Sequence, residues 1–154
     1  MLEGDASSTA RWRDGITARL VAVERVPNSW GVDIPKSRAL VRLRYVIGNE
    51  GAGPLPIEPH SSWVTLFYGV NRTEGEREAG YSYDNPKENE RKGLNGDNDP
   101  TRIMPGTKAT YVETYAVPIA ELGSLVAAAS PPAEEGIRDS YTFLGVEKVL
   151  VEVK

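Results

Sequence analysis

The side chains best suited to bind a metal ion lie in a polar stretch of the chain, residues 71–103. Carboxylate and amide oxygens are the ligands that Ca²⁺ prefers, and the ion takes about six to eight of them. The candidate calcium ligands surround the turn-forming Gly96 and are Asn95, Asp97, Asn98 and Asp99. The pattern departs from an EF-hand loop because no Glu closes it and Pro100 interrupts it. The same residue types also form solvated turns, so calcium binding and a plain turn are the two interpretations.

A second candidate site lies just before the first, where two tyrosines are followed by polar side chains. The residues are Tyr81, Tyr83, Asp84 and Asn85. Aromatic rings beside polar groups suit a sugar-binding platform or a contact with a protein partner. Tyrosines at this spacing also pack along the edge of a sheet without binding a ligand. These four residues are the candidate ligand-binding residues of the chain.

His60 is the single histidine of the chain, and Ser61 and Ser62 follow it. A catalytic triad needs a base that a carboxylate orients and that points at a hydroxyl group. Neighbouring residues of a strand point to opposite faces, and no nucleophile-elbow pattern surrounds Ser62. The favoured interpretation is a surface histidine at the start of a strand, and a hydrolase that uses His60 is a remote alternative. We therefore expect no catalytic residue and no enzymatic activity.

The composition excludes several other classes of function. The chain has 154 residues, no cysteine, one histidine and a formal charge of -4. Zinc sites built on cysteine and the HExxH zinc motif are therefore excluded. A net negative charge argues against binding of nucleic acid, which needs a basic surface. No apolar run has the length of a membrane span, so we expect no membrane-spanning segment in these 154 residues.

Alternation of apolar and polar residues predicts strands rather than helices. The alternation is clearest from 41 to 47, where Val41, Leu43 and Tyr45 are expected to face a core. Further strands are expected at 16–26, 62–70, 107–117 and 141–153, and one short strand at 78–83. Frequent breakers, with 11 Pro and 15 Gly, separate these runs and leave little room for long helices. About six to eight short strands describe an all-β, antiparallel sandwich.

The domain organisation follows from the same pattern. Residues 1–14 are expected to form a flexible, polar N-terminal tether, and residues 15–154 a single sandwich domain. Residues 71–103 form a long polar insertion in that domain. From 72 to 99 the insertion holds five basic and eight acidic residues. A loop of this length in a compact domain is typical of a functional or mobile segment.

Two expectations concern charged side chains on the predicted strands. Tyr111 and Glu113 share one face of their strand, and an unpaired Glu in the core would be costly. Either Tyr111 faces outward, or Glu113 lies beyond the core at the rim of the sheet. On another strand Arg38, Arg42 and Arg44 form a basic stripe. The stripe is expected to meet an acidic partner or to lie on a solvated outer face balanced by Glu side chains.

Three turn motifs carry a resemblance to a known family. They are Asn49-Glu50-Gly51, Pro105-Gly106 and Val117-Pro118, around strands of the predicted sandwich. In this pattern the chain resembles the immunoglobulin-like domains of exported actinobacterial lipoproteins and secreted antigens, the DUF4352-type and MPT63-like domains. The resemblance covers roughly residues 15–153 and implies an immunoglobulin-like sandwich, export and often a lipid-anchored tether. It implies no activity and no catalytic residues.

Together these observations predict a non-catalytic binding or interaction module that acts outside the cytoplasm, secreted or at the cell surface. Its working surface is expected in the 71–103 insertion, because loops on a rigid sandwich carry recognition. The expected partner is a protein or another component of the cell envelope. A Ca²⁺-stabilised or carbohydrate-binding module is the alternative.

Overall fold

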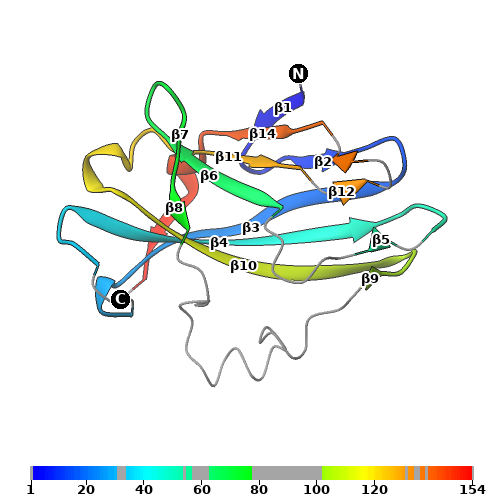
Figure 1. Cartoon of the computed structure of the whole chain (residues 1–154), viewed down its shortest axis with the longest axis horizontal. Helices are drawn as coiled ribbons and strands as arrows, with labels where there is room; N and C mark the ends of the chain where they lie inside the picture. Colours follow the sequence, from blue (N-terminus) through cyan, green and yellow to red (C-terminus); the bar gives the residue numbers. More distant parts are fainter. Residues whose placement is uncertain are drawn as a thin grey trace.

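The computed structural model describes residues 2–30, 34–53, 55–56, 63–77, 102–130, 132–133, 136–137 and 139–153. In these ranges the regular structure consists of strands and short 3-10 turns (Figure 1). The strands are β1 Leu2–Asp5, β2 Thr9–Arg11, β3 Ile16–Val26, β4 Arg38–Asn49, β5 Leu55–Pro56, β6 Val64–Tyr68, β7 Thr73–Glu74, β8 Glu76–Arg77, β9 Arg102–Ile103, β10 Thr107–Pro118, β11 Val126–Ala129, β12 Pro132–Ala133, β13 Gly136–Ile137, β14 Tyr141–Leu144 and β15 Leu150–Glu152. The 3-10 turns are η1 Asn28–Trp30, η3 Ile119–Glu121 and η4 Val146–Val149.

Two sheets pack face to face, which confirms the predicted β-sandwich. One sheet has the strand order β1-β14-β11-β6-β7, and the other has the order β15-β3-β4-β10-β8, with β2 also paired to β3. Nearly all pairs are antiparallel; β1 with β14 and β15 with β3 are parallel. The strands outnumber the six to eight expected because the additional ones have two to four residues. Such short strands show too few alternations to be recognised in a sequence.

The core lies between the two sheets and follows the predicted alternation of β4. Val41, Leu43 and Tyr45 are buried there, as expected. Tyr115 of β10 also lies in the core, and its hydroxyl donates a hydrogen bond of 2.7 Å to the backbone carbonyl of Val64 in the opposite sheet. This buried bond ties the two layers together where apolar contacts alone would leave their relative position less well defined.

A bulge in β3 decides which side chains face outward. The register of β3 against β4 shifts between Leu20 and Ala22. Before the shift Leu20 faces the core; after it Val23 faces the core, and Glu24 pairs with Arg42 on the outer face. Because side chains alternate along a strand, an unbulged strand would place Leu20 and Glu24 on the same face. The extra residue therefore keeps a carboxylate out of the core.

The N-terminal residues belong to the sandwich and do not form the expected tether. β1 pairs with β14 from Leu2↔Tyr141 to Asp5↔Leu144. β2 pairs with β3 along the first half of its edge, and β15 pairs with the second half of the same edge. β1 pairs with a strand far along the chain, and β2 has only three residues, so neither strand left a periodic signal in the polar sequence of 2–11.

The C-terminal run forms two strands in different sheets rather than the single strand expected at 141–153. Gly145 follows β14 with a φ of 67° and begins the turn η4, after which β15 joins the other sheet. Glycine adopts this left-handed conformation without the steric cost that a Cβ atom brings. Gly145 therefore marks a crossing between the two sheets.

Candidate functional site

The candidate site residues from the sequence lie outside the described residues. This holds for the ligand-binding and calcium-binding candidates in 81–99 and for His60, Ser61 and Ser62. Their predicted roles stay predictions. In the ranges that the structure describes, no group of three or more His, Asp or Glu side chains could hold a metal ion. The described helical turns include none of the length and apolarity that a membrane span requires. What the structure does define is how the two ends of segment 78–101 are attached to the sandwich.

The start of the segment is set by a crossing between the two sheets at Gly75. β7 pairs with β6 in one sheet, and β8, one residue later, pairs with β10 in the other. The buried Gly75 donates its N–H to the carbonyl of Leu66 at 2.8 Å. A Cβ atom at this position would lie 3.2 Å from the Leu66 oxygen and 3.2 Å from Val117 Cγ1. The crossing therefore leaves little room for a side chain, because both sheets approach it closely.

A buried ion pair follows the crossing. Arg77 Nε lies 2.9 Å from Glu113 Oε2, and Arg77 Nη2 donates to Glu113 Oε1 at 3.5 Å. The Glu113 side chain is 7% exposed and that of Arg77 is 39% exposed. The pair resolves the conflict over Tyr111 and Glu113. Tyr111 packs against the core, and Glu113 is buried on the same face instead of lying at the rim, because Arg77 supplies the opposite charge.

Aromatic side chains extend this cluster into the core. The hydroxyl of Tyr45 lies 3.5 Å from Glu113 Oε1 and donates to it. Burial raises the pKa of Tyr45 well above its usual value, and the negative charge of Glu113 raises it further. The Tyr111 ring lies 5.5 Å from the rings of both Tyr45 and Trp63. Trp63 is buried in the core, so a packed aromatic layer lies behind the ion pair.

The end of the segment is held by Asn49, the first residue of the first turn motif. Its Nδ2 donates to the carbonyls of Gly53 and Ile103, both at 2.8 Å, and its Oδ1 accepts the N–H of Gly51 at 2.9 Å. Its backbone carbonyl accepts the N–H of Gly106 at 2.7 Å. Two of the turn motifs thus meet at one buried asparagine. β9, which contains Ile103, also pairs with β5, so this end is attached through both a strand pair and a side chain.

The two attachment points lie at opposite ends of β10 (Figure 1). β8 pairs with β10 at Tyr115 and Ala116, whereas Thr107, the first residue of β10, pairs with Asn49. The eight residue-to-residue steps from 107 to 115 correspond to about 26 Å at the usual rise of a strand. The 24 residues of 78–101 join these two points, and they carry six acidic and three basic side chains. The described residues on either side of this acidic, polar stretch of sequence therefore lie at distant points of β10.

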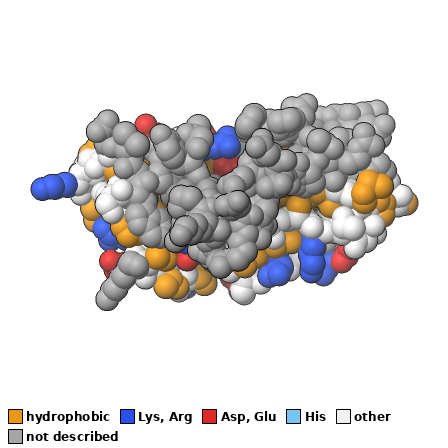
Figure 2. Space-filling view, turned by 90° about the horizontal axis from the view of Figure 1, so that it is seen from below, with side chains coloured by type: hydrophobic (Ala, Val, Ile, Leu, Met, Phe, Trp, Pro, Cys, Tyr) orange, Lys and Arg blue, Asp and Glu red, His pale blue; other side chains and the backbone are white. Residues whose placement is uncertain are grey.

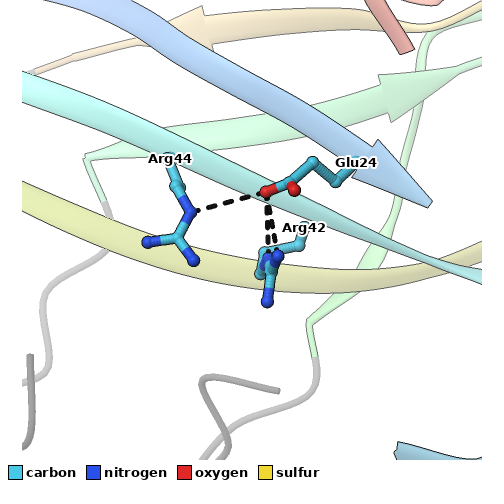
Figure 3. A network of polar contacts seen from close by, with 3 residues as sticks. All are labelled: Glu24, Arg42 and Arg44. Atoms are coloured by element: carbon cyan, nitrogen blue, oxygen red, sulfur yellow. Dashed lines mark hydrogen bonds and ion pairs between the residues drawn. The ribbon is translucent and has the colours of Figure 1, made fainter. Parts of the chain in front are cut away.

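The basic stripe lies on the outer face of the same sheet. Glu24 Oε1 accepts hydrogen bonds from Arg42 Nε at 3.2 Å, Arg42 Nη2 at 3.0 Å and Arg44 Nε at 3.4 Å (Figure 3). The expected balance by a Glu side chain is thus present, but the face is not simply solvated, because the Arg42 side chain is 4% exposed. Seen from below, the described surface shows Lys and Arg, Asp and Glu, and apolar side chains interspersed (Figure 2).

Comparison with known proteins identifies the fold and no family. No protein-family model and no curated protein sequence matches the chain. A candidate lipoprotein, ycdA, from Bacillus subtilis shares the fold with a TM-score of 0.58 and 16% identity, covering 91% of this chain and 38% of its own. A candidate lipoprotein from Staphylococcus aureus has a TM-score of 0.53 and 11% identity, covering 96% of this chain and 99% of its own. This chain thus spans well under half of the ycdA chain. At these identities the likeness establishes a shared β-sandwich fold.

Proposed function

We propose that the protein is a non-catalytic binding or interaction module that acts outside the cytoplasm, with the 71–103 region as its working surface. The observation that carries the proposal is the attachment of 78–101 at two widely separated points of β10. Buried contacts hold each point, through Glu113 at the start and Asn49 at the end. A sandwich that fixes the ends of a long polar segment in this way is suited to present it to a partner.

The fold supports the proposed location, and the turn motifs of the sequence are the basis of the proposed family. Both structures that share it are described as candidate lipoproteins, which are proteins attached to membranes by lipid. The three turn motifs support membership of the DUF4352-type or MPT63-like domains and an actinobacterial source. We place the protein at the cell surface or in the secreted fraction, with a protein or cell-envelope component as partner. A lipid anchor near the N-terminus is the proposed link to a membrane.

A Ca²⁺-stabilised or carbohydrate-binding module is the second candidate. The hard oxygen donors of Asn95, Asp97, Asn98 and Asp99 favour it, and so do the neighbouring rings of Tyr81 and Tyr83. This candidate predicts that Ca²⁺ raises the melting temperature, since a ligand that binds only the folded state stabilises it. At 100 times its Kd the gain is about 2.7 kcal/mol, or about 5–10 °C for a chain of this size. Asp97→Ala should abolish that shift.

The main proposal is tested by capture of partners from an extract of the source organism's envelope. The bait is the full chain, and the matched control replaces residues 84–99 with a Gly/Ser segment of the same length. We expect the control to keep the melting temperature of the natural chain and to lose at least one captured component. Capture of the same components by both chains would contradict the proposal, because the chemistry of the segment would then be irrelevant.

A further inference from the structure

We propose that Arg77 and Glu113 are positioning residues of the binding region. Their ion pair, rather than strand pairing, fixes β8 and therefore the position of Arg77, the last described residue before 78–101. The inference rests on the proposed function for its biological meaning. Its geometric part concerns described residues alone.

The strand pairing of β8 is too short to hold it in place. β8 has two residues, Glu76 and Arg77, and both are exposed. They pair with Ala116 and Tyr115 of β10 over those two positions only. Exposed hydrogen bonds of an edge strand open with little free-energy cost, so a ladder of this length does not by itself give a defined position.

The ion pair of Arg77 and Glu113 gives β8 the defined position that its two-residue strand pairing does not. Both guanidinium nitrogens that contact Glu113 come from one planar group, and they meet the two oxygens of one carboxylate at 2.9 and 3.5 Å. A two-point contact between planar groups fixes orientation as well as distance. Glu113 in turn is held within β10 and by the hydroxyl of Tyr45. The ion pair thus links β8 to Glu113 of β10 and, through the hydroxyl of Tyr45, to β4 inside the six-stranded sheet.

The chain on the other side of the crossing has a different support. Thr73 and Glu74 of β7 pair with Tyr68 and Phe67 of β6, in the opposite sheet. The N–H of Gly75 is bonded to Leu66 of the same strand. Loss of the ion pair should therefore free β8 and leave β7 where it is. Because only Gly75 separates β7 from β8, the position of β7 serves as an internal control for the release of β8.

The absence of cysteine from the sequence allows spin labels to be placed at chosen pairs of positions. One chain carries labels at Glu76→Cys and Thr110→Cys, and the control carries them at Thr73→Cys and Thr110→Cys; all three residues are exposed. Distances are measured by pulsed electron resonance in the otherwise natural chain and with Arg77→Gln or Glu113→Gln. We expect either substitution to widen the 76–110 distribution about twofold, as local release of an edge strand does, and to leave the 73–110 distribution unchanged.

An unchanged 76–110 distribution would overturn the inference, and so would equal widening of both distributions, which would indicate general loosening. Arg77→Lys keeps the charge but not the planar fork, and it should give an intermediate width. The envelope capture then separates this inference from the proposed function. If the natural chain captures nothing through 84–99, the proposed function fails. If it captures a component that Arg77→Gln captures equally well, the positioning role fails.

Discussion

The guanidinium of Arg77 lies 2.9 Å from the carboxylate of Glu113, across the edge of the six-stranded sheet. The two residues are 36 positions apart, and the crossing at Gly75 brings them together. Glu113 is buried and Arg77 is partly exposed. The loss of stability should therefore depend on which of the two residues is replaced. This difference leads to the first prediction.

Arg77→Gln should destabilise the protein more than Glu113→Gln. The first change leaves a buried carboxylate without the cation of the pair, while the second leaves an Arg side chain that is 39% exposed and can reach water. Breaking a fully buried pair costs about 3–5 kcal/mol, and partial exposure lowers this to about 2–3 kcal/mol for Arg77→Gln. For Glu113→Gln we expect about 1 kcal/mol. Unfolding in urea measures both, and equal losses would contradict the buried position of Glu113.

Glu24→Gln should cost clearly more than Glu50→Gln. Glu24 accepts bonds from two Arg side chains, and its own side chain is 20% exposed. Glu50 pairs with Arg11, and both of those side chains are 64% exposed. We expect a loss of about 1–3 kcal/mol at Glu24 and less than about 0.5 kcal/mol at Glu50. If denaturant unfolding gave the same small loss of stability for both variants, the contacts of Glu24 with Arg42 and Arg44 would contribute little to the stability of the fold.

Gly75→Ala should destabilise the crossing between the sheets. The added Cβ atom would lie 3.2 Å from atoms of both sheets, closer than ordinary van der Waals contact. Overpacking of this kind costs about 1–3 kcal/mol. Gly123→Ala is the matched control, because a Cβ atom there meets no atom within 4 Å. Thermal melts of the two variants should differ by several degrees, and equal melting temperatures would show that the crossing has room for a side chain.

Tyr45 should make the protein less stable at alkaline pH. Burial raises the pKa of Tyr45 in the folded state, so above about pH 10 the unfolded chain loses a proton that the folded chain keeps. Stability is then fully present below pH 10 and falls as the pH rises, by at most about 1.4 kcal/mol per pH unit. Tyr45→Phe removes this proton from the balance. Melts between pH 9 and pH 11 should show a shallower decline for Tyr45→Phe, and parallel curves would rule out a role for Tyr45.

The central sheet could be predicted from the sequence because its strands are long and one face of each is lined by apolar side chains. β4 extends over 12 residues, and its Val41, Leu43 and Tyr45 alternate with outward-facing side chains. The short strands could not be predicted in this way. β1 has four residues, most of them exposed, and it is defined by its pairing with β14, far along the chain. Pairing with a distant strand leaves no periodic signal when neither face is buried.

The contacts of the candidate site could likewise be predicted from the sequence only in part. The sequence revealed the conflict between Tyr111 and Glu113, but both alternatives drawn from it kept the carboxylate out of the core. The cation that pairs with Glu113 could not be derived, because Arg77 reaches Glu113 only through the change of sheet at Gly75. The role of Asn49 was likewise visible only as a turn motif. Its bonds to Gly53 and Ile103 depend on how three separate turns meet in space.

The proposal that 71–103 is the working surface is tested most directly by site-specific crosslinking. A photoreactive group is attached to a single cysteine at Tyr81→Cys or Asp84→Cys, and, as a control, at Lys36→Cys on an exposed turn of the sandwich. The labelled chains are irradiated with the envelope extract and the covalent adducts are quantified. We expect one adduct that is strong from positions 81 and 84 and weak or absent from position 36. An adduct of equal yield from position 36, or from position 36 alone, would contradict the proposal that 71–103 is the working surface.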